Sequence, residues 1–327
     1  HLRKSSIDWK ERMKKKNNEF DETGTGNLND TELSKKLGYY QNKSRICLRI
    51  GMISAICGVI TFFAVPGKEI KAIVSTVLIF GGICFALFLA KEAQRKANTL
   101  LQNGLGDFFR AEWNRLFGPD LHLPEMQIDR SLMKKLYRMN DSWEECVVEN
   151  FHEGDHGNVH FSAANVCLNH LYEAGSIREG KSIKRDAMFR GLVICCFTSF
   201  STDSIVRIIK RTDNCPRGVV TDHEIFNRRF CVTAEREQDV SCLLTPQFLE
   251  LLVKFEQIIE GRFVSACWDG SVFSLALDTD YGFACVADHV NLRDLDAVRK
   301  SYTNSLSEME QMLDLLRNST NLFRAVD

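Results

Sequence analysis

The chain of 327 residues contains only five prolines and almost no net charge, because 42 basic residues balance 43 acidic ones. The scarcity of proline argues against long disordered linkers. The balanced charge provides no field that would attract nucleic acid, so we expect no nucleic-acid partner. The sequence also lacks a Gly-x-Ser-x-Gly motif and an evident cysteine–histidine pairing. We therefore expect no catalytic residues, no organic cofactor and no enzymatic activity.

The twelve cysteines include no Cys-x-x-Cys motif and no series of closely spaced pairs. Cys47, Cys57 and Cys84 lie in or next to very apolar segments, whereas Cys195 and Cys196 are adjacent in a strand-like run. Neighbouring residues of a strand point to opposite faces of the sheet. We therefore expect free, mostly buried thiols in a reducing compartment.

Two apolar runs predict a helical transmembrane hairpin. Neither Ile50–Val65 nor Ala72–Ala90 contains a charged residue, and only six residues separate the two runs. About 20 apolar residues cross the hydrocarbon layer as a helix. The first run reaches this length if it extends back over Ile46–Leu48 and Arg49 snorkels to the interface.

Small residues at i, i+4 spacing would allow the two helices to approach closely. They are Gly51 with Ala55, Ser54 with Gly58, and Gly82 with Ala86. A buried hairpin of a soluble protein is the alternative, but both runs are apolar on every face, which favours lipid.

Basic residues flank both outer ends of the hairpin and predict its orientation. Those before the first run are Lys35, Lys36, Lys43, Arg45 and Arg49, and those after the second are Lys91, Arg95 and Lys96. By the positive-inside rule, both termini should lie in the cytoplasm.

The predicted fold class is an α+β membrane protein with five parts. They are a cytosolic N-terminal segment (1–44), the transmembrane hairpin (45–91), a juxtamembrane helical stalk (92–140), an antiparallel α+β cytosolic domain (141–290) and a C-terminal helix (291–327). A shorter helix is expected around Arg130–Met139 at the end of the stalk.

Local patterns predict the elements of the α+β domain. A turn is expected at Glu153–Gly157, and Ser204–Arg211 is expected to form a hairpin with the apolar strand Met188–Phe200. Thr245 before a proline predicts the start of an amphipathic helix. Asp269-Gly270 predicts a tight hairpin between two further strands.

The last predicted helix, near Leu292–Leu316, carries apolar residues at sevenfold spacing: Leu295, Tyr302, Met309 and Leu316. Such spacing suits either docking on the chain's own domain or self-association as a homo-oligomer. Docking is the more common outcome, and self-association stays open.

Several motifs resemble the bacterial membrane family catalogued as domain of unknown function 3137, over roughly Phe109–Phe283. They are Asn150–Asp155, Phe189–Leu192, Phe230–Val232, Leu244–Glu250 and the glycine-turn hairpin Ser265–Leu277. The polar insert Tyr172–Lys184 and the segment before the membrane depart from the family pattern. The resemblance implies a cytosolic domain anchored in the bacterial inner membrane, with a LemA-type protein as one conceivable partner. It implies no established activity.

The stretch FDETGTGNLNDTEL resembles an EF-hand calcium loop that begins at Asp21. Gly26 occupies position 6 of this loop and Glu32 occupies position 12. The candidate ligands are Asp21, Thr23, Thr25, the backbone carbonyl of Asn27, Asn29 through water, and Glu32. Threonines stand where Asp or Asn is expected, so we expect weak binding, with a Kd of about 10⁻⁴ M or poorer.

Two other motifs suggest alternative chemistry. Gly175–Ser182 matches the consensus sequence of a phosphate-binding loop, which would make the protein an NTPase. The residues before it, however, are too polar for the buried strand that such a loop follows. His152, Glu153, Asp155, His156 and His160 cluster near a turn, as zinc ligands can, but an exposed polar turn is the preferred explanation.

Our preferred hypothesis is a non-enzymatic, membrane-anchored interaction module whose specific role is unknown. A calcium-responsive membrane protein that acts through Asp21–Glu32, and an NTPase that acts through Gly175–Ser182, are the alternatives.

Overall fold

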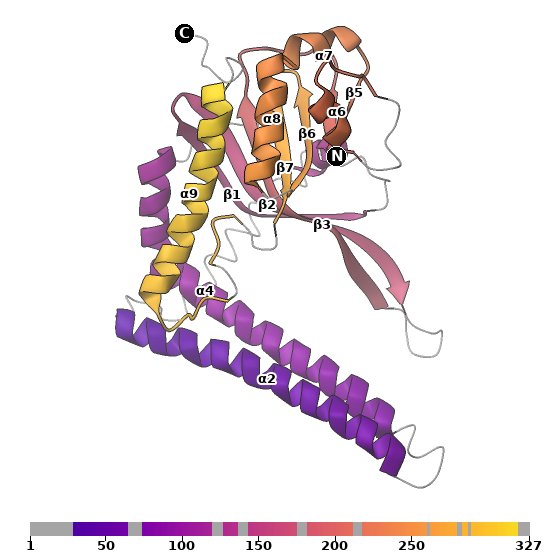
Figure 1. Ribbon diagram of the computed structural model, residues 1–327. Coiled ribbons are helices and arrows are strands. Elements are labelled where there is room, and N and C mark those ends of the chain that lie inside the picture. Colours follow the sequence, from indigo (N-terminus) through magenta and orange to yellow (C-terminus); the bar gives the residue numbers. More distant parts are fainter. Residues whose placement is uncertain are drawn as a thin grey trace, which may run out of the picture. The chain divides into compact units, whose positions relative to one another are not determined.

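The computed structural model describes residues 29–64, 74–119, 127–136, 143–174, 182–211, 218–259, 262–279, 283–286 and 289–319 (Figure 1). The chain forms two compact units. The first consists of residues 1–109 and 291–298, and the second consists of residues 110–290 and 299–327.

The first unit is built from long helices. They are α2 (Asp30–Ala64), the π-helical turn η2 (Val77–Gly81) and α4 (Gly82–Phe117), whose last turns belong to the second unit. By length and composition, the two long helices could each cross a membrane. Only 17% and 18% of their most apolar stretches are buried, so neither resembles the core helix of a soluble protein. The two predicted apolar helices are confirmed, and the helical pattern predicted to extend to Phe117 is confirmed as well.

Small residues bring α2 and the following helix together, as the spacing predicted. A methyl group at Gly51 would lie 2.8 Å from Cβ of Ala86, and one at Gly82 would overlap the side chain of Ser54. The hydroxyl of Ser75 donates a hydrogen bond of 2.6 Å to the carbonyl of Gly58. This bond satisfies a buried hydroxyl between two apolar helices.

The segment between the second unit and the last helix is fastened to α2 within the first unit. The Ser34 hydroxyl donates to the carbonyl of Arg293 at 2.5 Å, and the backbone N–H of Leu292 donates to Oε1 of Gln41 at 3.1 Å. The aliphatic stem of Arg293 occupies the space that a side chain at Gly38 would fill. Residues 291–298 therefore belong structurally to the helical hairpin.

The second unit contains one antiparallel sheet of seven strands in the order β1-β2-β3-β7-β6-β4-β5. The strands are β1 (Glu145–His156), β2 (Val159–Ala174), β3 (Ser182–Phe197), β4 (Val206–Lys210), β5 (Phe230–Ala234), β6 (Phe263–Asp269) and β7 (Val272–Asp278). The helices are α5 (Arg130–Leu136), α6 (Glu224–Arg229), α7 (Glu237–Leu243), α8 (Pro246–Ile258) and α9 (Leu295–Ser319), of which residues 299–319 belong to this unit.

Two predictions about the sheet are wrong. The turn predicted at Glu153–Gly157 is shorter, because β1 continues to His156 and only Gly157 and Asn158, both with positive φ, reverse the chain. The segment Ser204–Arg211 does form a strand, but β4 pairs with β5 and β6 rather than with β3. The free edge of β3 is instead taken by β7.

Helix α8 covers one face of the sheet, across β6 and β7 (Figure 1). Thr245 caps it, because its hydroxyl accepts a hydrogen bond from the N–H of Phe248 at 3.3 Å, and Pro246 follows as predicted. The fully buried ring of Phe248 lies edge-on to Trp268, with centroids 5.0 Å apart. The predicted β6–β7 hairpin is confirmed, with Gly270 at a φ of 62° in its two-residue loop.

The residues at sevenfold spacing in α9 are buried within the single chain. Tyr302 is 3% exposed, Leu316 is 1% exposed and Met309 is fully buried. Asp314 on the same helix forms an ion pair of 2.9 Å with His156 at the end of β1. The apolar stripe of α9 is therefore used inside the chain.

We predict that Phe248→Ala lowers the free energy of unfolding by about 3–5 kcal/mol, because it removes a large aromatic ring from a closed core. Chemical or thermal unfolding of the purified chain measures this loss. Ile258→Ala is the matched control, since this apolar residue of α8 is 53% exposed and its truncation should have little effect. Equal effects of the two substitutions would contradict the assigned orientation of α8.

Candidate functional site

The motif Asn150–Asp155 lies on β1, where it holds another part of the chain. Asn150 has a φ of 51° at a bulge in the β1–β2 pairing, and its side-chain amide lies 3.1 Å from Sγ of Cys285. On β2, Asn165 donates to the carbonyl of Phe283 at 2.8 Å and accepts from its N–H at 2.7 Å. Two asparagines thus fasten residues 283–286 to the sheet. Sequence reasoning missed Asn165, which stands outside every recognised motif.

An aromatic cluster surrounds the contacts between these two asparagines and residues 283–286. Trp113, near the end of α4, is 2% exposed and stacks on the ring of His152 with centroids 4.5 Å apart. Phe117, Phe161 and Phe283 pack around the same indole. The partly buried motif histidine therefore packs in an aromatic cluster.

The histidines and carboxylates predicted as an alternative zinc site do not converge. His156 pairs with Asp314, while Nδ1 of His160 lies 2.8 Å from a carboxylate oxygen of Asp155. Three or four ligands must meet around a zinc ion. The residues that the structure describes include no group of three or more His, Cys, Asp or Glu side chains that could hold a metal ion.

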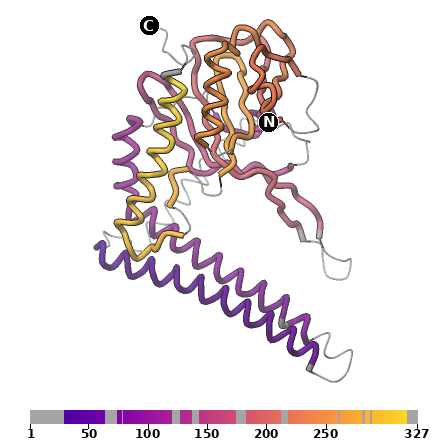
Figure 2. Tube along the Cα trace, in the orientation of Figure 1, coloured from indigo at the N-terminus to yellow at the C-terminus, as the bar shows by residue number. Residues whose placement is uncertain are grey.

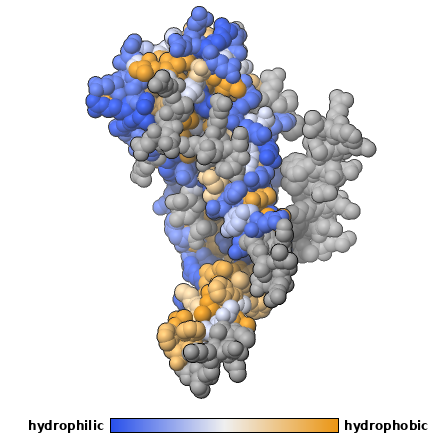
Figure 3. Space-filling model, turned by 90° about the vertical axis from the view of Figure 1, so that its right-hand side faces the viewer, coloured by the Kyte–Doolittle hydropathy of each residue, from blue (hydrophilic) through white to orange (hydrophobic). Residues whose placement is uncertain are grey.

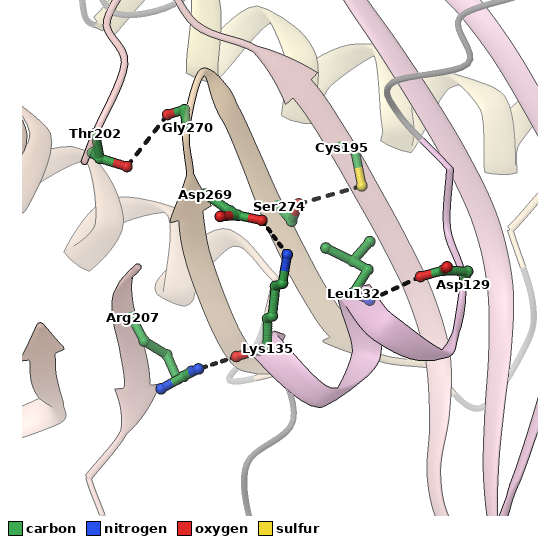
Figure 4. A network of polar contacts seen from close by, with 9 residues as sticks. All are labelled: Asp129, Leu132, Lys135, Cys195, Thr202, Arg207, Asp269, Gly270 and Ser274. Atoms are coloured by element: carbon green, nitrogen blue, oxygen red, sulfur yellow. Dashed lines mark hydrogen bonds and ion pairs between the residues drawn. The ribbon is translucent and has the colours of Figure 1, made fainter. Parts of the chain in front are cut away.

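A row of small side chains crosses the opposite face of the sheet, beneath α5, and Figure 4 shows two of its members, Cys195 and Ser274. Ser162, Cys195, Ser274 and Cys267 stand in register on β2, β3, β7 and β6. The Ser274 hydroxyl donates to Sγ of Cys195 at 3.4 Å. Burial raises the pKa of Cys195 to about 11 and that of Cys267 to about 12. Because only the thiolate is reactive, these thiols are inert at neutral pH.

Helix α5 is held over this row by polar contacts that Figure 4 shows. Lys135 forms an ion pair with Asp269, and its carbonyl accepts a hydrogen bond from the guanidinium of Arg207. Met133 and Leu136 of the same helix are fully buried against the sheet. These contacts hold α5 as a stable cover over the buried thiols.

Strands β2 and β3 continue beyond the rest of the sheet and form a two-stranded arm of residues 170–174 and 182–188 (Figure 2). The pairing of β1 with β2 ends at Asn169, and the pairing of β3 with β7 begins only at Gly191. Tyr172, Ile183 and Met188 are exposed on this arm. Part of the segment that the sequence marked as an insert is thus an ordered projection.

Two carboxylates support the root of the arm. Glu145 accepts hydrogen bonds from Arg185 at 2.8 and 3.2 Å and from Asn169 at 2.9 Å, and these bonds lower its pKa. The N–H of Leu171 donates to Glu144 at 2.6 Å, and this bond is the main reason that the pKa of Glu144 is lowered as well. Both carboxylates are therefore ionised at neutral pH.

The loop of the predicted phosphate site lies mostly outside the described residues, but both of its flanks are described. Ala174 at the end of β2 pairs with Ser182 at the start of β3, so an antiparallel strand follows the loop. A phosphate-binding loop requires a helix in that place, because the helix N-terminus binds the phosphate. The described flanks therefore do not fit a phosphate-binding loop, and NTPase activity through Gly175–Ser182 stays an untested alternative.

Of the six candidate calcium ligands, only Asn29 and Glu32 lie within the described residues. Asn29 caps α2: its Oδ1 accepts from the N–H of Thr31 at 3.3 Å, and its carbonyl accepts from the N–H of Glu32 at 2.8 Å. The carboxylate of Glu32 lies 3.0 Å from the ammonium of Lys36. Calcium binding stays a prediction, because Asp21, Thr23, Thr25 and Asn27 lie outside the described residues.

Comparison with known proteins finds a family that part of the chain resembles, and that family has no described activity. Residues 187–318 match the model of a family described as "Protein of unknown function (DUF3137)". The resemblance to that family is confirmed. The match includes Phe189–Leu192, Phe230–Val232, Leu244–Glu250 and the β6–β7 hairpin, and it extends into α9. It leaves out Asn150–Asp155, which precedes it in the chain.

No curated protein matches the chain. Among solved structures, the crystal structure of the mycobacterial trehalose monomycolate transport factor A, TtfA, is similar over 46% of this chain and 74% of that chain. The two sequences are 10% identical and the TM-score is 0.21. At this TM-score, the likeness carries no argument about fold or function.

We predict that Asn165→Ala lowers the free energy of unfolding by about 1–3 kcal/mol, because it leaves the backbone N–H and carbonyl of Phe283 without their partner. Thermal unfolding of the purified chain measures the change. Asn304→Ala, an exposed asparagine of α9, is the control and should leave stability nearly unchanged. A loss no greater than that of the control would show that residues 283–286 do not depend on Asn165.

We also predict that the chain binds no calcium at about 10 µM, because a loop with so few carboxylates attracts the ion weakly. Calorimetric titration of the protein in detergent, with Glu32→Gln as the comparison, tests this expectation. Heat of binding in this range that disappears in Glu32→Gln would favour the calcium-responsive alternative.

Proposed function

We propose that the protein is a non-enzymatic interaction module anchored in a membrane by α2 and α4, with the α+β unit as its binding domain. The observation that carries this proposal is the exposure of large apolar side chains along the hairpin. Phe63 is 80% exposed, Phe88 is 68% exposed and Phe80 is 66% exposed. Figure 3 shows hydrophobic surface gathered over this hairpin.

An apolar surface of this kind is unfavourable in water but suited to lipid. The short contacts at Gly51 and Gly82 support the same conclusion, because close packing through small residues is the way in which helices associate in a bilayer. The Ser75 hydroxyl is bonded to the carbonyl of Gly58, so this buried polar group would be satisfied within hydrocarbon.

The distribution of charge supports an orientation with both termini in the cytoplasm. Arg45, Arg49 and Lys91 are exposed at the end of the hairpin where the apolar runs stop. All eleven cysteines that the structure describes are free thiols, which suits a reducing compartment. With the family match, these features favour the inner membrane of a bacterium.

The chemistry of the α+β unit supports binding rather than catalysis. Its buried thiols are protonated at neutral pH, and its motif histidine is packed against Trp113. The arm, in contrast, offers exposed apolar and charged side chains on an ordered strand. A protein partner is the kind of ligand that such a projection would contact.

We predict that a cysteine introduced at Gly67, between the two helices, reacts with a membrane-impermeant maleimide in intact bacterial cells. The naturally exposed Cys242 of α7 should react only after the cells are lysed, which provides an internal control in the same chain. The physical reason is that the positive-inside rule places the intervening turn outside and the α+β unit inside. Labelling of Cys242 in intact cells would contradict the orientation, and release of the protein by alkaline extraction would contradict the anchor.

A further inference from the structure

The arm has a free backbone edge. Residues Ile183–Ala187 of β3 pair with β2 on one side, and no other strand that the structure describes pairs with them on the other side. In an antiparallel strand, backbone N–H and C=O groups alternate between the two edges. This edge therefore presents hydrogen-bonding groups that a further strand could pair with.

The side chains along this edge are all exposed. Ile183 is 65% exposed, whereas Phe189, where β3 joins the sheet, is only 5% exposed. Lys184 and Asp186 lie two positions apart, so their side chains point to the same face of the sheet. Neither forms an ion pair with any residue that the structure describes. Arg185, which lies between them, is bound by Glu145 on its own chain.

We propose that the occupant of this edge is the same edge of a second copy of the chain. In an antiparallel pair of copies centred on Arg185, Lys184 lies opposite the partner's Asp186, and the two-fold symmetry repeats this contact. Ile183 then lies opposite the partner's Ala187. Arg185 then lies opposite the partner's Arg185, but each guanidinium reaches back across β2 to Glu145 of its own chain, which offsets its charge and holds it away from the axis.

The order of charges selects this arrangement over others. Charged residues on an edge strand normally block the addition of strands, because most incoming strands leave those charges unmatched. A parallel copy in register would place lysine against lysine and aspartate against aspartate. Only the antiparallel two-fold register matches both charges, so the same residues that exclude other strands accept a second copy.

This surface differs from the apolar stripe of α9, which is buried within each chain. It also does not rest on insertion into a membrane, because the edge belongs entirely to the α+β unit. Its test and the topology test can therefore fail independently.

The experiment measures dimerisation of the full chain in detergent, by light scattering after size exclusion and by sedimentation over a concentration series. The wild type is expected to dimerise. Asp186→Lys and Lys184→Asp should each raise the dimer Kd by about tenfold or more, because each turns two attractive contacts into two repulsive ones. The double variant Lys184→Asp with Asp186→Lys exchanges the charges and should restore a Kd close to that of the wild type.

Glu250→Lys is the matched control, because it makes the same change of charge as Asp186→Lys at an exposed position of α8. It should leave the dimer unchanged, and circular dichroism checks that every variant is folded. A monomeric wild type would overturn the proposal. So would a dimer that is insensitive to the single substitutions, or a double variant that stays as weak as either single variant.

Discussion

The pairing of β3 with β7 is the interaction on which the α+β unit depends. It joins residues 191–197 to residues 272–278, and so brings the meander β1–β2–β3 against the later strands β4 to β7. Successive side chains of these strands point to opposite faces of the sheet, and a different helix covers each face. Phe273 packs toward α8, while Ser274 faces the row of polar residues under α5. A single register therefore determines both layers of the core.

Elements with a strong local cause could be predicted from the sequence. Thr245 and Pro246 specify the start of α8, Gly270 specifies the β6–β7 loop, and the uncharged runs specify two long helices. Each of these signals acts within a few residues or one turn of helix, so no distant partner is needed to interpret it. The family resemblance followed from several such local motifs in order along the chain.

Features that depend on distant residues could not be predicted. The partner of β4 is decided by which strand occupies the edge of β3, and β7 lies well away along the chain. The two hydrogen bonds between the side chain of Asn165 and the backbone of Phe283 join residues that show no local sequence pattern. The motif histidines were misread for a related reason, because sequence proximity does not reveal that His152 and His156 have separate partners, Trp113 and Asp314.

The arm shows how local electrostatics can hold structure outside a core. An isolated two-stranded ribbon is marginal in water, so the contacts at its root matter more than those along its length. Glu144 and Glu145 both have a lowered pKa because they accept hydrogen bonds from Leu171 and Arg185 respectively. A carboxyl whose folded pKa lies below its unfolded value contributes stability above the unfolded pKa, and that stability is lost as the pH falls through the folded pKa. The contribution of these two carboxylates to the support of the arm is therefore present at neutral pH and is lost in acid.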